Sequence, residues 1–149
     1  MNTVCAKPQG TRMRSGALHL TQKVDYALYL LTCLAQYSDG QHSSIATIAK
    51  KSHLSFSFLQ KVANILKRAG LIHSHRGKDG GYSLAHKPSD IVLRDVIEAL
   101  EGPITVMACA GEAKHDCPRK SFCSIRSGFQ KMNDEIHVAY LSKTLTDFL

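Results

Sequence analysis

The stretch that decides the fold of this chain runs from Ser55 to Ala85 and has the sequence SFSFLQKVANILKRAGLIHSHRGKDGGYSLA. In its first half, apolar residues stand three or four positions apart, which predicts a helix with one buried face. That face comprises Phe56, Leu59, Val62, Ala63, Leu66 and Ala69. Ser55 is a suitable N-cap because its hydroxyl can accept a hydrogen bond from the first turn, and Gly70 suits the left-handed end of a helix.

The second half of the stretch predicts a two-stranded hairpin. Residues 71–76 are predicted to form the first strand and residues 82–85 the return strand, and Asp79-Gly80-Gly81 between them is predicted to supply the positive φ angles of a tight turn. A short helix is predicted just before the stretch, from about Ser44 to Ser52, followed by a turn at His53-Leu54. Two helices joined in this way make a helix-turn-helix, and the basic hairpin makes it a winged one.

The positive charge of the chain is concentrated in this region. Residues 50–87 contain eight Lys or Arg and one acid, Asp79, whereas the remaining residues hold eleven of each sign. A solvated basic face is the simpler interpretation of a charge run. Because the charge falls on a helix and a hairpin, we favour a surface that contacts phosphates of DNA.

The second helix of a helix-turn-helix is the one that enters a major groove. We therefore predict that the helix beginning at Ser55 and the wing contact DNA. Gln and Asn can pair bidentately with adenine, whereas Lys is equally suited to phosphate. The predicted contact residues are Ser55, Ser57, Gln60, Lys61 and Asn64 in the helix and Arg76 and Lys78 in the wing.

The 149 residues, 44% of them hydrophobic, suffice for one domain plus a dimerisation element. We predict a mainly α fold with a small β-wing. Residues 1–18 form a flexible arm in which Arg12 and Arg14 are candidates for a minor-groove contact, and Met13 is an alternative start. Residues 19–88 form the winged domain, 89–123 a connecting helix and a cysteine loop, and 124–149 a dimerisation helix.

Two further helices are predicted on either side of the winged unit. The first covers about residues 21–37, with Asp25 in its first turn, where an acid complements the helix dipole. The second covers 91–101, capped by Ser89-Asp90 and ended by Gly102-Pro103.

No apolar run approaches the ~20 residues of a membrane span, and the first residues lack the apolar core of a secretory signal. We therefore expect a cytoplasmic protein.

Three of the five cysteines fall within fifteen residues, with the spacing C-x7-C-x5-C; they are Cys109, Cys117 and Cys123. Thiolates are soft ligands that suit iron–sulfur clusters or zinc. Free cysteines grouped by chance are the alternative, and a disulfide is less favoured in a reducing compartment. A fourth ligand is missing from the loop, unless His115 or a residue from elsewhere, including a partner subunit, serves. Cys33 is predicted to be an inert core thiol.

Residues 124–149 carry apolar side chains mostly three or four positions apart, which predicts one long amphipathic helix. Such a helix can lie back on its own domain. We favour dimerisation, because winged-helix proteins often bind palindromic sites as two-fold dimers.

The chain resembles the IscR/NsrR/RirA-type winged-helix repressors of bacteria over residues 19–148. The matching segments are LTQKVDYAL (20–28), residues 55–71, the wing SHRGKDGGYSLA (74–85), DIVLRDVIEALEG (90–102) and the three cysteines. The resemblance implies a dimer crossed by C-terminal helices, with an iron–sulfur cluster on Cys109, Cys117 and Cys123. The cluster would sense nitric oxide, iron, cluster supply or redox state.

Two departures from the family pattern bear on the type of cluster. The commoner spacing is C-x5-C-x5-C, and members of the IscR kind have a histidine where this chain has Arg126, which argues against a 2Fe–2S site. Members of the NsrR kind hold a 4Fe–4S cluster whose fourth ligand is an acid in helix 1 of the other subunit. Asp25 matches that position, so Asp25 gains a second candidate role as the fourth ligand, and a 4Fe–4S cluster is favoured over a 2Fe–2S one.

The predicted function is ligand-gated DNA binding by a transcriptional regulator, expected to be a repressor. A cluster-free regulator whose cysteines sense oxidants as thiols is the alternative. Enzyme activity is not supported, since residues 77–81 lack the Gly-Lys-Ser/Thr of a phosphate-binding loop and no nucleophile–base pair is evident.

Overall fold

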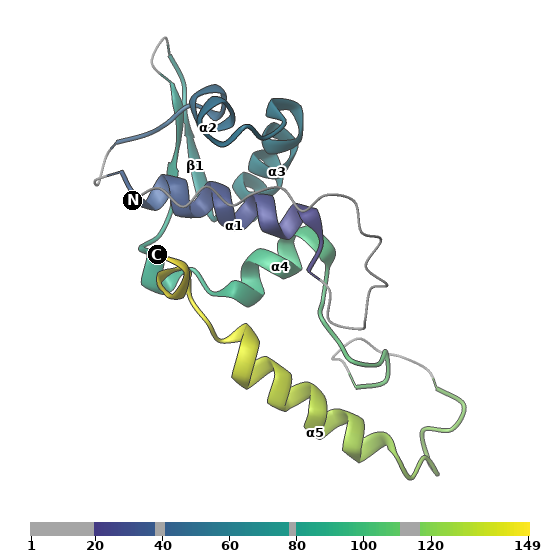
Figure 1. Cartoon of the computed structure of the whole chain (residues 1–149). Helices are drawn as coiled ribbons and strands as arrows, with labels where there is room; N and C mark the ends of the chain where they lie inside the picture. The colour runs from purple at the N-terminus through teal and green to yellow at the C-terminus, as the bar shows by residue number, and fades with distance from the viewer. Residues whose placement is uncertain (1–19, 38–40, 78–79, 111–116) are drawn as a thin grey trace.

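A computed structural model describes residues 20–37, 41–77, 80–110 and 117–149. The arm predicted for residues 1–18, with Arg12 and Arg14, lies outside the described residues, as do Lys78 and His115. Figure 1 shows the helices before residue 102 and a hairpin grouped together, with a later helix projecting away from them.

Of the first three helices, the second and third form the predicted helix-turn-helix. The three are α1 (Gln22–Ala35), α2 (Ile45–Ser52) and α3 (Phe56–Arg68), each within two residues of its predicted bounds. The hydroxyl of Ser44 accepts a hydrogen bond from the backbone N–H of Thr47 at 3.1 Å, and that of Ser55 accepts one from Phe58 at 3.4 Å. His53, with φ 56°, makes the turn between α2 and α3. Each helix therefore begins and ends where its local sequence indicates.

Gly70 ends α3 in the left-handed conformation that the sequence predicted, with φ 74°. Its N–H donates to the carbonyl of Lys67 at 3.1 Å, and the N–H of Leu71 donates to that of Leu66 at 3.0 Å. This pair of bonds is the Schellman arrangement, which satisfies carbonyls at the end of a helix. It also turns the chain directly into the wing.

The wing consists of β1 (Ile72–His75) and β2 (Gly81–Leu84), paired antiparallel with Ile72 opposite Leu84 and His75 opposite Gly81. Two backbone hydrogen bonds, of 3.0 and 2.8 Å, join Tyr82 to Ser43 and so fix the wing to the segment before α2. The prediction that Asp79-Gly80-Gly81 supplies positive φ angles is wrong at Gly81, and Asp79 lies outside the described residues; a described turn residue with positive φ is Gly77. Gly81 instead lies within β2, where the strand closely approaches Ser43.

We expect Gly81→Ala to destabilise the fold by about 1–3 kcal/mol, the usual cost of overpacking. A Cβ atom at Gly81 would stand 2.6 Å from the backbone carbonyl of Ser43, so the wing or the neighbouring segment must shift. Gly128→Ala is the matched control, since a Cβ atom there meets open space. That substitution lies in a helix and should be neutral or stabilising by up to about 1 kcal/mol. Urea unfolding measures both, and equal stabilities would contradict the close approach at Gly81.

The core lies between the helix-turn-helix, the base of the wing and α4 (Leu93–Glu101). The ring of Tyr26 in α1 meets that of Phe58 in α3 edge to face, with centroids 4.9 Å apart. The largest fully buried side chains come from α1, α3, β1, the segment that leads into α4, and the end of the chain: Leu30, Leu31, Leu59, Leu66, Ile72, Ile91 and Leu145. This core sets the orientation of α3 and of the wing, and therefore of the predicted DNA-binding side chains.

The prediction that Ser89-Asp90 caps a helix beginning at residue 91 is wrong. Residues Pro88–Asp90 form a 3-10 turn (η1), and the hydroxyl of Ser89 donates to the carboxylate of Asp90 at 2.9 Å. Residues 91 and 92 are extended because they pair with the end of the chain: the N–H of Leu145 donates to the carbonyl of Ile91 at 2.8 Å. α4 therefore begins only at Leu93, without a side-chain cap.

The prediction of one continuous helix over residues 124–149 is also wrong. The segment comprises α5 (Arg126–Ile136), a π-helical turn η2 (His137–Leu141) and a 3-10 turn η3 (Leu145–Phe148). Beyond η2 the chain returns to the winged unit, where Leu145 is 1% exposed. Thr144 and Asp147 form a capping box there, and the N–H of Thr144 lowers the pKa of the Asp147 carboxyl. Pairing between residues far apart in sequence thus ends the helical pattern.

α5 itself projects from the winged unit (Figure 1). Asn133 is its buried residue, and the apolar side chains along it are open to solvent or only partly covered. In the described part of the chain, no helix combines the length and apolar character that crossing a membrane requires.

Candidate DNA-binding surface and cysteine site

The side of α3 that faces away from the core carries the predicted groove contacts. Ser55, Ser57, Gln60, Lys61 and Asn64 are all exposed. Leu59, Val62, Ala63 and Leu66 are buried on the opposite side. Arg76 is exposed just beyond β1. The helix therefore presents polar and basic side chains outward while its apolar side holds it on the core.

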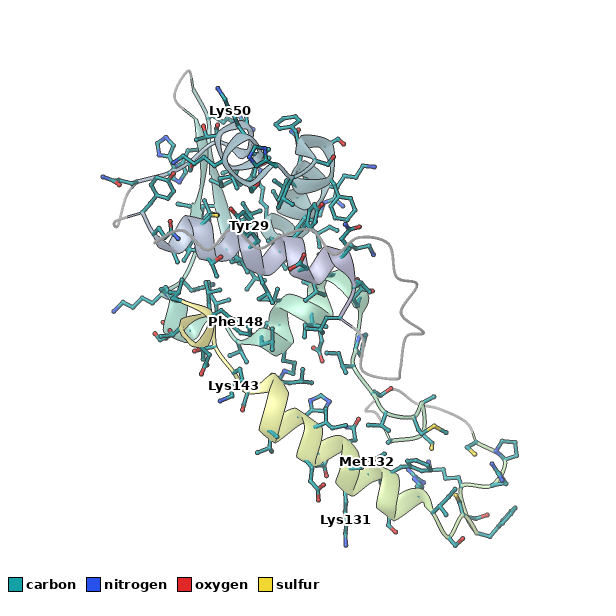
Figure 2. All side chains as sticks on the ribbon, viewed as in Figure 1. Tyr29, Lys50, Lys131, Met132, Lys143 and Phe148 are labelled. Carbon is teal, nitrogen blue, oxygen red and sulfur yellow. The ribbon has the colours of Figure 1, made fainter. Side chains whose placement is uncertain are left out.

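Within residues 50–87, every Lys and Arg that the structure describes is exposed; they are Lys50, Lys51, Lys61, Lys67, Arg68, Arg76 and Lys87. None forms an ion pair with a described acid, since the three ion pairs among the described residues all lie outside residues 50–87. Lys50 projects from α2 in Figure 2. Uncompensated positive charge on a helix and a wing is suited to the phosphate backbone of DNA.

Phe56 departs from its predicted place on the buried face of α3. As the first residue of the helix it is 48% exposed, while Phe58 packs against Tyr26. Ser55 has a structural role in the free chain, since it caps α3 and its hydroxyl lies 3.1 Å from that of Ser57. An exposed aromatic ring at the start of a recognition helix is suited to apolar contact with a thymine methyl group. The sequence periodicity gave no indication of this exposure.

The three cysteines of the loop lie around one small hollow. Cys109, Cys117 and Cys123 line it together with Lys120 and Arg126, and the space enclosed is about 20 Å³. All three thiols are free and half-buried. The chain between Cys117 and the start of α5 lies at the end of α5 farthest from α1 (Figure 1). Within a single chain, the structure thus places the three cysteines around one hollow.

The thiols surround this hollow without meeting at a point. Among the described residues, no three His, Cys, Asp or Glu side chains are close enough together to hold a single metal ion. Asp25 does not line the hollow; it is exposed in the first turn of α1. The structure therefore does not bring Asp25 to the cysteines within one chain.

Arg126 and Lys120 are site residues that sequence reasoning did not predict. Lys120 is exposed at the rim of the hollow. Arg126 is the first residue of α5, and its Nε atom is buried without a hydrogen-bond partner among the described residues. The sequence marked Arg126 only as a departure from a histidine, because burial of its Nε depends on how the loop packs against α5.

Two hydrogen bonds join the start of the cysteine loop to α5 and η2. The backbone N–H of Val106 donates to Oδ1 of the buried Asn133 at 3.2 Å, and Nε2 of His137 lies 3.0 Å from the carbonyl oxygen of Ile104. The carbonyl can only accept, so Nε2 of His137 carries the proton. These contacts couple the position of the loop to that of α5.

Cys33 is separate from this site. It is half-buried in α1 and packs against the core, and burial raises the pKa of its thiol. A raised pKa reduces the fraction of reactive thiolate. The prediction of an unreactive core thiol agrees with this environment.

The fold and the exposed basic surface define the class of this protein: it is a winged helix-turn-helix regulator of transcription that binds DNA, and not an enzyme. The sequence model of the Rrf2 family, described as iron-dependent transcriptional regulators, matches residues 20–149. The chain therefore belongs to the Rrf2 family, and its resemblance to IscR-type regulators is confirmed.

Similar proteins agree with this assignment along most of the chain. Protein rrf2 of Nitratidesulfovibrio vulgaris Hildenborough is 33% identical over 132 residues, which cover 89% of this chain and 87% of that protein. The solved structure of T. potens IscR has a TM-score of 0.64 and 32% identity, covering 88% of this chain and 85% of IscR. That of CymR, the global cysteine regulator of B. subtilis, has a TM-score of 0.62 and 31% identity, covering 88% and 95%.

Proposed function

We propose that this chain is a homodimeric, cytoplasmic repressor whose binding to promoter DNA is gated by an iron–sulfur cluster on Cys109, Cys117 and Cys123. The observation that carries the proposal is the convergence of these three thiols on one hollow at the start of α5. When bound, such a cluster supplies chemistry that responds to nitric oxide, iron or redox state. The chain supplies the DNA-binding surface and the connection between that surface and the cluster.

The donor set fits a cluster better than a single ion. Soft thiolates are the usual ligands of iron–sulfur clusters. A cluster contains several irons, so its ligands surround a space rather than converge on one point, which agrees with the arrangement of the three thiols. The hollow of about 20 Å³ is little larger than the space one water requires, so the loop must widen to accept a cluster.

The chain offers a route from the cysteine loop to the DNA-binding surface. Asn133 and His137 tie the start of the loop to α5 and η2. Leu141, the last residue of η2, and Leu145, the first residue of η3, are buried in the core that holds α3. Widening of the loop therefore acts on a helix whose other end is anchored in the DNA-binding unit. Gating further requires that the cluster-loaded and the cluster-free protein differ in their fit to DNA.

Dimer formation through α5 supports binding to a palindromic site. Ile125 and Met132 lie seven positions apart, on one face of the helix, and are 58% and 39% exposed, so a second copy of α5 would cover them. A two-fold dimer places two α3 helices for half-sites about one DNA turn apart. It also brings Asp25 of one copy within reach of the cysteine loop of the other, which favours a 4Fe–4S cluster over a 2Fe–2S one.

The test is the absorption spectrum, with iron and sulfide analysis, of protein purified without oxygen. We expect a brown protein with about four irons per chain, loss of iron in Cys123→Ser, and reduced iron in Asp25→Ala. Cys33→Ser is the matched control and should retain the cluster, because Cys33 lies outside the loop. Promoter affinity of loaded and cluster-free protein, compared at one salt concentration, should differ.

Two outcomes would contradict the cluster. Wild-type protein that stays colourless and takes up no iron on reconstitution removes it. If promoter binding of such protein is instead controlled by peroxide and thiol reductant, the three cysteines act directly as redox-sensitive thiols. In either case the DNA-binding assignment stands, because it depends on α3 and the wing.

A further inference from the structure

Arg126 buries a hydrogen-bond donor that has no acceptor among the residues that the structure describes. Its Nε atom is inaccessible to solvent and lacks a partner among the described residues. Its side chain lines the hollow between Cys109, Cys117 and Cys123. A buried donor without an acceptor loses its bonds to water and gains nothing in return, and the loss is greater for a charged group. Such a group indicates that an acceptor belongs at this place.

The charge at the hollow is also not compensated by any acid in the described part of the chain. Neither Arg126 nor Lys120 takes part in an ion pair with any acid that the structure describes. Arg126 is in addition the first residue of α5, where the helix dipole adds partial positive charge. The polar groups that share the hollow with the two cations are the three sulfurs, which become anionic when they ligate iron.

We propose that Arg126 is a positioning residue of the cluster site, an inference that rests on the cluster assigned above. Its Nε–H donates a hydrogen bond to a sulfur of the cluster or of a ligating cysteine, and its charge offsets the negative charge gathered there. The guanidinium is protonated throughout the physiological pH range and has no lone pair to offer, so Arg126 is not itself an iron ligand. It stands near the iron without replacing the histidine of IscR-type sites.

The property that Arg126 should control is the reduction potential of the cluster. Reduction adds negative charge, which a neighbouring cation and a hydrogen bond to sulfur both stabilise. Removing Arg126 should therefore favour the oxidised state. We expect Arg126→Met to lower the ratio of reduced to oxidised cluster about tenfold at a fixed solution potential, equivalent to about 59 mV for a one-electron couple.

The experiment is a redox titration of the reconstituted full-length protein, monitored by absorption without oxygen. Arg126→Met keeps the length of the side chain but removes charge and donor. Arg126→Lys keeps the charge without the planar Nε–H, and should give a smaller shift. Arg119→Met is the matched control: Arg119 is exposed on the same loop and does not line the hollow, so the same change in net charge should leave the potential unchanged.

A wild-type potential in Arg126→Met overturns the inference and leaves the cluster assignment intact. An equal shift in Arg119→Met also overturns it, since the effect then reflects the net charge of the loop. If Arg126→Met holds no cluster, Arg126→Gln and Arg126→Lys provide the same comparison, and wild-type potentials in both overturn it. Wild-type protein that takes up no iron overturns both this inference and the proposed function. Iron uptake by the wild type therefore distinguishes failure of the proposed function from failure of the role of Arg126 alone.

Discussion

Replacing Gln60 by alanine is expected to weaken binding to the cognate operator about 10- to 100-fold while affecting unrelated DNA little. Gln60 is exposed on α3, the helix predicted to enter the major groove. A glutamine that pairs bidentately with adenine contributes about 1–3 kcal/mol of discrimination against the wrong base. Lys61→Ala should behave differently, because a phosphate contact carries no sequence information.

Lys61→Ala should weaken binding to both kinds of DNA and lower the salt dependence of log K by about one unit. Fluorescence anisotropy at several salt concentrations measures affinity and slope together. Lys131→Ala is the control, since Lys131 is exposed on α5, well away from α3 (Figure 2). Equal losses on operator and unrelated DNA in Gln60→Ala would contradict base recognition by Gln60. A loss in Lys131→Ala as large as that in Lys61→Ala would contradict the assignment of the surface.

The second large effect concerns the end of the chain. Leu145→Ala is expected to destabilise the protein by about 2–5 kcal/mol, the usual cost of truncating a buried leucine. Leu145 is 1% exposed, and its N–H donates to the carbonyl of Ile91 at 2.8 Å, so the cavity would open where the C-terminal segment meets the core. The midpoint of thermal unfolding should fall by about 5–15 °C.

Leu149→Ala is the matched control for Leu145→Ala. It makes the same chemical change four positions later, at a side chain that is 62% exposed. Its stability should lie within about 0.5 kcal/mol of the wild type. Urea unfolding of both variants measures the difference. Equal stabilities would show that the C-terminal turn is not part of the core, and the proposed route from α5 to the DNA-binding unit would lose its anchor.

The features that the sequence predicted well depend on residues close together in the chain. The spacing of Leu59, Val62 and Leu66 determines the buried face of α3, and Gly70 ends the helix by a local pattern of hydrogen bonds. The concentration of basic residues over 50–87 is likewise visible in the sequence alone. These features sufficed to predict a winged helix-turn-helix and the polar and basic side chains that α3 presents to solvent, but not the exposure of Phe56.

The cysteine site was predictable in part. The C-x7-C-x5-C spacing grouped Cys109, Cys117 and Cys123, and the structure places all three around one hollow. The two cations that line the hollow, Lys120 and Arg126, were not predicted as site residues. Arg126 has the position and the charge typical of an exposed side chain on a helix, and only the packing of the loop against α5 buries its Nε atom.

By itself, the sequence of this protein determined the winged helix-turn-helix, the basic side of α3 and the grouping of three thiols, because each follows from the spacing of neighbouring residues. Only the tertiary structure decided that residues 91 and 92 pair with the end of the chain, that Leu145 joins the core, and that Asn133 holds the cysteine loop. These contacts join residues 27 to more than 50 positions apart. A local pattern cannot specify them, because they depend on which surfaces meet when the helices pack together.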